Sequence, residues 1–350
     1  MGSLFNFINI PLGYVMRFLA ELLGGNFAAS VFAFTLLIDL LLIPLTIKSQ
    51  KSTVAQLRVK PKLDELKKRY GDDRKKFAAA QQELYQKEGV SMAGGCLPML
   101  VRLVLLFAIY SLILSPLTYM SGADKTKVNN VTNAVAAGME ELKEKDADKY
   151  EEIAKKISWN SSSKNSGNQL GVIKVVRDDT GIIEEILDEK EYEKIKDDLE
   201  AVREKDKKAG INYTLFGVDL TNKPSFNIDI FHHFEAGWLL PIGAFLAQML
   251  MSLVSAKINK INNPEAPSMM GMMLFVPIIS LFIGFTFPGG VCFYWICSSL
   301  IGGAIQAGVQ VFYGPQRLLA RQREKELGKQ CEFEEKQLLK FDGEKTETEN

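Results

Sequence analysis

Residues 31–47 read VFAFTLLIDLLLIPLTI, an apolar run with a single charged residue, Asp39. Four further runs of about 17 to 21 residues have the same character, at 97–117, 238–256, 269–287 and 291–311. A helix rises about 1.5 Å per residue, so about 20 apolar residues cross the roughly 30 Å of a bilayer's hydrocarbon core. Arg102 is the only other formal charge in these runs, whereas a soluble helix carries polar residues every three or four positions. The pattern predicts five membrane spans and excludes a soluble globular protein.

The overall composition conceals this segregation. The chain has 350 residues, 42 basic and 42 acidic, and its mean hydropathy is +0.01. Equal numbers of opposite charges exclude a function based on a molecule-wide basic or acidic field. The four cysteines, Cys96, Cys292, Cys297 and Cys331, show no paired spacing, so neither a disulfide scaffold nor a zinc site is expected. We expect no cofactor and no metal.

Lysine and arginine in the short loops predict the orientation, because short loops that are rich in these residues remain in the cytoplasm. Bases outnumber acids between the first two runs, and Lys257, Lys260 and Arg317 continue the pattern after the third and fifth. The N-terminus is therefore expected outside and the C-terminus in the cytoplasm. The expected order is an interfacial helix at 1–25, a span at 28–47, a cytoplasmic hairpin at 48–93, a span at 97–118, an outer segment at 119–237, a span at 238–256, a cytoplasmic link at 257–268, spans at 269–287 and 290–312, and a charged cytoplasmic tail at 313–350.

The stretch before the first span has the spacing of an amphipathic helix. Gly13, Arg17 and Glu21 are expected on one face, and the other carries Leu12, Val15, Met16, Leu19, Leu22 and Leu23. It is too short to span, and it lacks the basic start and continuous apolar core of a signal peptide. We expect a helix lying in the outer membrane–water interface. A merely hydrophobic lead-in to the first span is the alternative.

The hairpin segment predicts two helices, at 50–70 and 74–87, with Gly71-Asp72-Asp73 as the turn. Its exposed residues are expected to include Lys60, Pro61, Lys67, Lys68 and Arg69. Such a basic surface fits anionic lipid, a nascent chain or a ribosome. The alternative is a solvated hairpin that only connects two spans.

Several of these stretches together resemble the bacterial YidC membrane protein insertase family. They are TLLIDLLLIPLTIK at 35–48, KPKLDELKKRY at 60–70, GCLP at 95–98, FGVDLT at 216–221 and FPGG at 287–290, followed by Tyr294 and Trp295. The resemblance covers about residues 10–120 and 211–320. It is to the forms without a large N-terminal periplasmic domain, as in Gram-positive bacteria.

The resemblance implies an all-α, multi-pass protein of the bacterial plasma membrane with a five-helix transmembrane core, a cytoplasmic two-helix hairpin and an interfacial N-terminal helix. It implies an insertase and chaperone without covalent chemistry, not an enzyme, which moves polar tails of nascent membrane proteins through a groove open to the cytoplasm and to lipid. The implied partners are nascent membrane proteins and membrane lipids, with the Sec translocon, the ribosome and signal recognition particle components as further candidates. No specific nucleic acid is expected, and the working form is expected to be a monomer.

Two groove positions depart from the family pattern. The family usually has a basic residue where this chain has Asp39, and a neutral Gln where it has Arg102. A charge inside a span costs roughly 2.5–3.5 kcal/mol on insertion scales, so two opposite charges are more economical together. We therefore expect Asp39 and Arg102 to pair. The pair either serves substrate passage or only locks the first two spans together.

Other groove candidates follow by position. Thr35 and Trp295 match residues of the family that could touch a passing helix, and Tyr294, Ser252 and Gln306 are weaker candidates. Packing and interhelical hydrogen bonds explain such residues equally well.

The outer segment 119–237 is longer than the family's usual connection. Helix formers dominate 134–157 and 183–208, Ser158 to Gly167 is typical of a flexible linker, and Leu170 to Val176 suggests a strand. We expect a mostly helical insert, and favour a solvated spacer over a small domain that docks a partner. His232 and His233 lack ligand partners at suitable spacing and are expected at the interface.

Two other functions remain open from the sequence. An ion-coupled carrier would use Asp39 and Arg102 as a proton relay, although no inverted repeat supports it. A membrane scaffold would display the outer insert.

Overall fold

The computed structural model describes residues 2–71, 73–90, 97–159, 169–178, 181–224, 235–262 and 270–348. In these ranges the chain is helical apart from connecting segments and one short two-stranded sheet. It forms two compact units, one comprising Met1–Leu41, Val101–Leu253 and Met269–Ala304, the other Leu42–Leu100, Val254–Ser268 and Ile305–Asn350.

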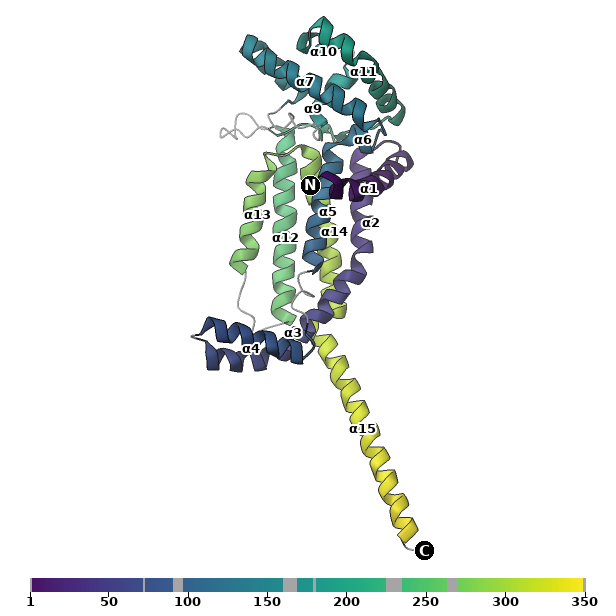
Figure 1. Ribbon diagram of the computed structural model, residues 1–350, viewed down its shortest axis with the longest axis vertical. Coiled ribbons are helices and arrows are strands. Elements are labelled where there is room, and N and C mark those ends of the chain that lie inside the picture. Colours follow the sequence, from purple (N-terminus) through teal and green to yellow (C-terminus); the bar gives the residue numbers. More distant parts are fainter. Residues whose placement is uncertain are drawn as a thin grey trace. The chain divides into compact units, whose positions relative to one another are not determined.

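The long apolar helices of the first unit are shown in Figure 1. These long helices are α2 (Phe27–Leu41), α5 (Leu97–Leu114), α12 (Leu239–Asn262), α13 (Met270–Gly284) and α14 (Gly289–Tyr313). The same unit also contains α1 (Gly2–Leu22) and the short α6 (Pro116–Tyr119). The residues at one end of α5, α12 and α14 are assigned to the second unit.

Glycines on α14 show how α2 and α14 pack. A Cβ added to Gly290 would lie 3.0 Å from the ring of Phe27, and one added to Gly302 would lie 3.2 Å from the carboxylate of Asp39. Residues 27 and 39 are as far apart in sequence as residues 290 and 302. The two helices therefore run parallel and in contact over about 18 Å.

The same reasoning orients α12 and α13. Gly243 and Met251 of α12 contact Ile296 and Gly303 of α14, so these helices are also parallel. By contrast, α13 is antiparallel to α12, because its end at Gly284 lies against Pro241 while Ser280 lies against Gln248. This alternation of direction is what successive membrane crossings require.

Length and hydropathy identify two helices in the described residues that could span a membrane, and a third if α2 and the helical stretch Ile43–Gln56 form one span. They are Ala236–Ile261 and a helix from Gly289. Leu103–Leu114 and Phe275–Gly284 are shorter apolar helices. The number of five spans therefore stays a prediction.

The segment predicted as a span at 28–47 is divided between two helices. The chain leaves α2 at Leu41 and starts α3 (Ile43–Tyr70) directly after Leu42, with Pro44 in the first turn of α3. Proline has no backbone N–H and clashes with the carbonyl four residues earlier, so it is accepted at a helix start and interrupts a helix interior.

One face of α1 packs against α5 and α6 of the same unit. Asn9 Nδ2 donates to Ser111 Oγ of α5 at 3.0 Å, and Gly13 lies so close to Tyr119 that a Cβ would be 2.6 Å from its ring. The opposite face exposes Phe7, Ile10, Tyr14, Phe18 and Leu22. The helix is confirmed, but the predicted faces are partly wrong: Gly13 lies on the packed face and Leu22 on the exposed one. Gly13 allows close contact with Tyr119 and the same face buries Met16 and Ala20, while the large apolar residues of the opposite face point outward.

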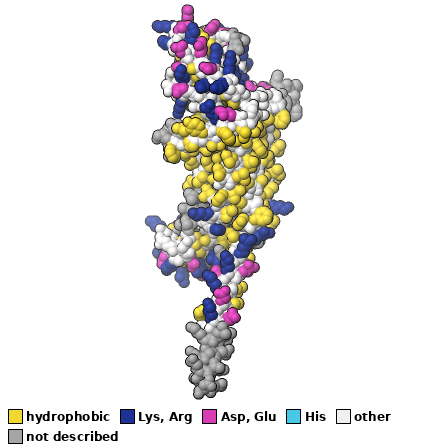
Figure 2. Space-filling view, turned by 90° about the vertical axis from the view of Figure 1, so that its right-hand side faces the viewer, with side chains coloured by type: hydrophobic (Ala, Val, Ile, Leu, Met, Phe, Trp, Pro, Cys, Tyr) yellow, Lys and Arg dark blue, Asp and Glu magenta, His cyan; other side chains and the backbone are white. Residues whose placement is uncertain are grey.

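The exterior of α2, α5, α12 and α13 is also apolar. Examples with at least two-fifths of their surface exposed are Phe32, Leu40, Phe107, Leu246, Leu250, Phe275, Val276 and Phe282. Figure 2 shows hydrophobic side chains gathered over the helices of this unit, and charged side chains gathered on the insert. Such a large exposed apolar area is expected of helices in lipid.

The insert is a packed helical domain. Its elements are α7 (Lys125–Lys145), α8 (Ala147–Ile157), α9 (Leu170–Arg177), α10 (Ile182–Ile186), α11 (Glu189–Ala209), β1 (Thr214–Leu215) and β2 (Val218–Asp219), followed by the 3₁₀ helix η2 (Ala236–Trp238). Its core includes Val128, Val135, Met139, Ile157, Val172, Ile173, Ile183, Leu199 and Val202. The favoured interpretation of a solvated spacer is therefore wrong, and so is the strand at 170–176, which is α9. In the predicted linker, only Ser158 and Trp159 belong to the described residues.

Buried polar groups attach the insert to the apolar helices. Arg177 of α9 forms an ion pair with the buried Asp206 of α11, with Nη2 3.0 Å from Oδ1, and Ser121 Oγ donates to the same carboxylate at 2.8 Å. The Arg177 guanidinium also lies 4.8 Å from the centroid of the Tyr213 ring, which packs on Phe27 of α2. The insert and the start of α2 thus share one buried network.

The FGVDLT stretch lies between the starts of two apolar helices. The Phe27 N–H donates to the Asn212 carbonyl at 3.0 Å, just before the stretch, and the Gly290 N–H donates to the Leu220 carbonyl at 2.7 Å. Because the first N–H groups of a helix have no partner within the helix, these bonds satisfy groups that would otherwise be left in an apolar environment.

The second unit contains the hairpin of α3 and α4 (Arg74–Lys87) and the tail helix α15 (Pro315–Thr348). The predicted α4 is confirmed at both ends, and Asp73 caps it by accepting the backbone N–H groups of Lys75 and Lys76. Lys62 pairs with Glu88 at 2.5 Å across the hairpin. On the other side, α15 packs on α3, where Arg58 pairs with Glu326 at 2.8 Å.

Candidate functional site

Two polar side chains are buried on one face of the apolar helix α2. The Thr35 side chain is 3% exposed, and its hydroxyl donates to the Val31 carbonyl at 2.7 Å. Asp39 lies one turn further along and is 9% exposed. A residue four positions further along a helix lies on the same face, so the α2 sequence itself places these two groups together.

Gly302 of α14 provides the room for the Asp39 carboxylate. A Cβ at this position would lie 3.2 Å from Oδ2 and 3.4 Å from Oδ1 of Asp39. The adjacent Gly303 is in still closer contact with Met251 of α12, where a Cβ would lie 2.6 Å from the side chain. Glycine pairs on spans allow helices to approach closely, so this Gly-Gly step brings α2, α14 and α12 together around the carboxylate.

Gly302 is absent from the residues expected from the sequence. The sequence marks this position only weakly, because the chain contains 27 glycines and a Gly-Gly step in an apolar run does not indicate which side chain lies opposite.

The expected partner of Asp39 cannot be placed in the same way. Arg102 belongs to α5, but its side chain lies outside the described residues. The pairing of Asp39 with Arg102 therefore stays a prediction.

The aromatic candidates lie nearer the start of α14. Trp295 precedes Gly302 by two turns on the same face, and its ring packs edge-on against Phe287 with centroids 5.7 Å apart. Phe287 in turn packs edge-on against Tyr110 of α5 at 5.4 Å. Tyr294 is 5% exposed and belongs to the core of the unit. These contacts show Trp295 and Tyr294 in packing positions and do not test whether they touch a substrate.

A polar contact that the sequence reasoning missed joins α12 and α13. Ser280 Oγ lies 2.8 Å from Gln248 Oε1 and 2.7 Å from the Pro277 carbonyl, and its single proton can serve either acceptor. The signal was a glutamine inside the otherwise apolar run at 238–256. Ser252, one turn after Gln248, and Gln306, which belongs to the second unit, are both half-buried.

The hairpin places its basic residues at the surface of the second unit. Pro61, Lys67, Lys68 and Arg69 are exposed and Lys60 is half-exposed. Between α3 and α4 lies a cavity of about 680 Å³, lined by Lys62, Glu65, Leu66, Arg69, Tyr70, Ala80, Glu83, Leu84 and Lys87. The hairpin can thus present both charge and a small apolar recess.

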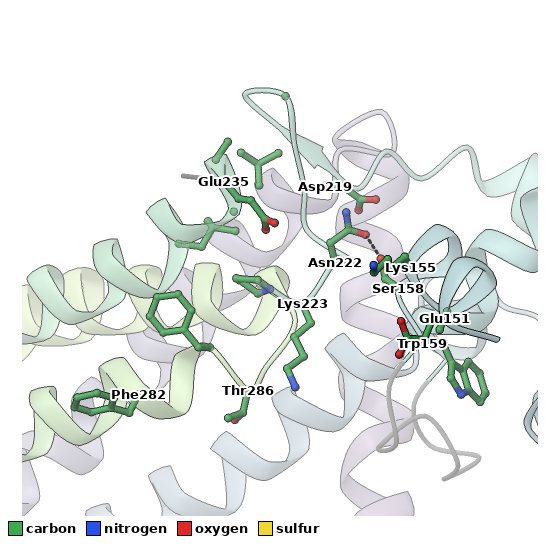
Figure 3. Close-up of a pocket in the computed structure, with 18 of the residues that line it drawn as sticks. Glu151, Lys155, Ser158, Trp159, Asp219, Asn222, Lys223, Glu235, Phe282 and Thr286 are labelled. Atoms are coloured by element: carbon green, nitrogen blue, oxygen red, sulfur yellow. Dashed lines mark hydrogen bonds between the residues drawn. The ribbon is translucent and has the colours of Figure 1, made fainter. Parts of the chain in front are cut away.

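A larger cavity, of about 1090 Å³, lies in the first unit where the insert meets the apolar helices, and Figure 3 shows its lining. No group of metal-ligating side chains is found in the described ranges. His232 and His233 lie outside them.

The chain is similar in sequence to a known family of membrane proteins. The family model described as 60Kd inner membrane protein matches residues 18–176 and 185–314. The membrane protein insertase YidC of Dinoroseobacter shibae is 36% identical over 138 residues, which cover 36% of this chain and 23% of that protein. Proteins of the same name from Anaeromyxobacter dehalogenans strain 2CP-C and Pseudomonas entomophila are 42% identical over 98 residues and 41% over 108, covering 28% and 31% of this chain and 18% and 19% of theirs. The aligned part thus spans less than a quarter of each relative.

Proposed function

Because this chain belongs to the 60Kd inner membrane protein family, which includes the YidC proteins, we propose that it is a membrane protein insertase of the bacterial cell membrane. It would help newly made membrane proteins to enter the bilayer and fold there, without covalent chemistry. The observation that carries the proposal is the family match over both the helices and the site, which includes the α2–α14 contact at Asp39.

The buried polar groups support a role in moving polar segments. An unsatisfied polar group in hydrocarbon costs several kcal/mol, so an ionisable residue within a span marks a functional path more often than a packing solution. Thr35 and Asp39 are buried polar residues among apolar helices, and Asp39 is ionisable. A groove that opens beside them to the cytoplasm and to lipid would shorten the apolar path of a short polar tail.

The energy for this step comes from the substrate. Burial of apolar surface stabilises by about 25 cal/mol per Å², so about 20 apolar residues that leave water release far more than one short tail requires. The insertase lowers a barrier and needs no fuel for short tails.

The Asp39–Arg102 pair is part of the proposal. A lone cation in the groove would attract acidic tails, whereas a paired one offers little net charge. Substrate selection in this chain would therefore depend on a wet, polar path more than on electrostatic capture. Trp295, Tyr294, Ser252 and Gln306 are proposed as further contacts of the passing helix.

The orientation and partners follow from charge. The N-terminus and the insert lie outside, and the hairpin and the tail lie in the cytoplasm, where Lys60, Lys67, Lys68 and Arg69 would receive nascent chains. The ribosome, signal recognition particle components and the Sec translocon are the partners that such a surface would serve. Insertion proceeds alone or beside Sec.

Reconstitution tests the activity. The full chain is placed in liposomes, a small single-span protein is synthesised outside them, and its protection from added protease is measured. We expect protection above empty liposomes, its loss in Asp39→Lys, and its recovery in Asp39→Lys combined with Arg102→Glu.

Glu152→Lys, a charge reversal at an exposed position of α8, is the matched control and should protect as well as the parent chain. Equal protection by the single and the double variant would refute the pairing. No protection by a correctly folded and oriented parent chain would refute Sec-independent insertion. Crosslinks from Thr35 and Trp295 to ribosome-bound nascent chains separate an insertase from a carrier, which would give none.

A further inference from the structure

The hairpin of β1 and β2, at the end of the insert, carries an exposed aromatic residue at its tip. Leu215 pairs with Val218, so only Phe216 and Gly217 form the turn. Phe216 is 96% exposed, more than any other large apolar side chain in the part of the chain that the structure describes. A single exposed apolar residue is ordinary on a protein surface. The backbone at this position is not.

The turn has a conformation that is unfavourable for phenylalanine. Phe216 has a φ of 48° and Gly217 a φ of 83°, and two positive φ angles are typical of a type I′ turn. Asn-Gly is the usual pair in such turns, whereas a bulky side chain is rare in the left-handed region. One position thus combines a strained backbone with an exposed apolar ring, and strained residues of this kind cluster at sites of binding.

The base of the hairpin is attached to the starts of three apolar helices. Asn212 accepts from the Phe27 N–H at the start of α2. Leu220 accepts from the Gly290 N–H at the start of α14. In addition, β2 packs against η2, the 3₁₀ turn that leads into α12. These three helices run parallel, so their starts mark one end of the apolar helices, which is the outer end in the orientation proposed above.

The tip lies close to this end. A strand rises about 3.4 Å per residue, so Phe216, three residues after Tyr213, lies within about 10 Å of the hairpin base. Its neighbour Gly217 lines the cavity of Figure 3 together with Leu240 and Phe282, near the ends of α12 and α13. The headgroup region of a bilayer is roughly 5–8 Å thick on each side of the hydrocarbon. A tip at this distance is at the height of the lipid headgroups.

The helix α1 brings a second exposed aromatic surface to the same end. Just after α1, the Gly25 carbonyl accepts from the Asn212 N–H at 2.7 Å, at the base of the hairpin. The exposed face of α1 includes Tyr14 and Phe18. Two elements that are separate in sequence therefore expose aromatic side chains beside the starts of the apolar helices, and a lipid surface accounts for both.

The tip itself carries no charge. Residues 214–218 are uncharged, and Leu215 and Val218 are half-exposed apolar residues. The first charged residue after the turn, Asp219, pairs with Lys174 at 3.5 Å. An apolar tip whose nearest charge is paired can enter a lipid interface at little cost in desolvation.

We propose that the hairpin tip inserts into the headgroup region of the outer leaflet, with the Phe216 ring among the glycerol and upper acyl groups of the lipids. Aromatic side chains are favoured at this depth, because the ring leaves water while nearby polar groups stay hydrated. Burial of the ring in lipid offsets the strain of the turn. The hairpin thereby holds the insert at a fixed height on the membrane.

The inference rests on the membrane placement proposed above and is independent of insertase activity. Depth is measured on the full chain in liposomes of phosphatidylethanolamine and phosphatidylglycerol, with no substrate protein. A nitroxide label is attached to one introduced cysteine in a Cys96→Ser, Cys331→Ser background, in which the remaining Cys292 and Cys297 are buried. Relaxation of the label by oxygen, which concentrates in lipid, is compared with relaxation by a water-soluble nickel complex.

Three labelled positions are compared. Phe282→Cys, on the exposed apolar surface of α13, reports on lipid and checks the membrane placement itself. Lys190→Cys, exposed at the end of α11 that is far from the hairpin in sequence, reports on water. We expect oxygen to relax the label more than nickel at Phe216→Cys, as at Phe282→Cys, and the reverse at Lys190→Cys.

A second set of variants tests the ring. The label is moved to Thr214→Cys, an exposed position of β1 two residues before Phe216. Phe216→Asn removes the ring and suits the left-handed backbone, so the turn is retained. It should increase relaxation by nickel at residue 214. Phe216→Trp keeps an aromatic ring and should leave this relaxation unchanged.

The proposal is overturned by any of three results. Relaxation by nickel as strong at Phe216→Cys as at Lys190→Cys would place the tip in water. Shielding of Phe216→Cys from both oxygen and nickel would mean that a protein surface, such as a second copy of this chain, covers the tip. Unchanged relaxation by nickel at Thr214→Cys in Phe216→Asn would show that the ring does not hold the tip in lipid. Strong relaxation by nickel at Phe282→Cys as well would instead refute the membrane placement on which the inference depends.

Discussion

The contact between Gly302 and Asp39 makes a steric prediction that can be worked out in free energy. In Gly302→Ala the new Cβ would lie 3.2 and 3.4 Å from the carboxylate oxygens of Asp39, closer than an ordinary contact. Overpacking of this kind costs about 1–3 kcal/mol. Alanine also stabilises a helix interior by about 0.5–1 kcal/mol relative to glycine, which offsets part of the loss.

Gly308 supplies the matched control. It belongs to the same helix, and a Cβ there would meet nothing within 4 Å. Gly308→Ala therefore has the helical gain without the crowding. The difference between the two variants isolates the contact with Asp39, and we expect Gly302→Ala to be less stable than Gly308→Ala by about 1–3 kcal/mol.

The assay is the free energy of unfolding in mixed micelles, from a titration with sodium dodecyl sulfate followed by far-UV circular dichroism. The comparison is repeated in two backgrounds, because a double-mutant cycle removes the effect of changing Asp39 itself. Asp39→Ala takes away the crowded atoms, so the difference should fall below about 0.5 kcal/mol, within the usual error of additivity. Asp39→Asn keeps the size of the side chain, so the difference should persist. A difference that survives in Asp39→Ala would show that Gly302 does not make room for the carboxylate.

Three further predictions concern the insert and the orientation. Leu199→Ala should destabilise the insert by about 2–5 kcal/mol, since Leu199 is fully buried, and limited proteolysis should then cut within the insert before the apolar helices. Burial, and after it the nearby Asp206 charge, raises the pKa of Tyr213 well above its usual range. Tyr213 therefore favours the folded state while it is neutral, and this contribution to the free energy of unfolding is lost as the pH rises above about 10. Tyr213→Phe should flatten the decline of the melting temperature at alkaline pH, and an unchanged decline would contradict this. In a Cys96→Ser background, a membrane-impermeant maleimide should label the exposed Cys331 only in broken cells, where the reagent reaches the cytoplasmic face, and the buried Cys292 and Cys297 should stay unlabelled. Labelling of Cys331 in intact cells would contradict the predicted orientation.

Local pattern was sufficient where the physical cause is local. The start of the helix at Arg74 is encoded within a few residues, because Asp73 accepts the N–H groups of Lys75 and Lys76. Pro44 is visible in the sequence too, yet the apolar run concealed the interruption that it causes. Leu170 to Val176 has an apolar, β-branched composition that favours a strand, but packing against α7, α8 and α11 makes it helical.

The sequence alone determined that the chain is built of apolar helices with charged segments between them, because the cost of placing charges in hydrocarbon separates the two kinds of residue along the chain. It also placed Thr35 and Asp39 on one helical face. Only the tertiary structure decided that Gly302 lies opposite Asp39, that the insert packs into one core with the apolar helices, and that a cavity forms where the two meet. Each of these depends on residues far apart in sequence meeting at contact distance, and no local periodicity records which distant side chain fills the space.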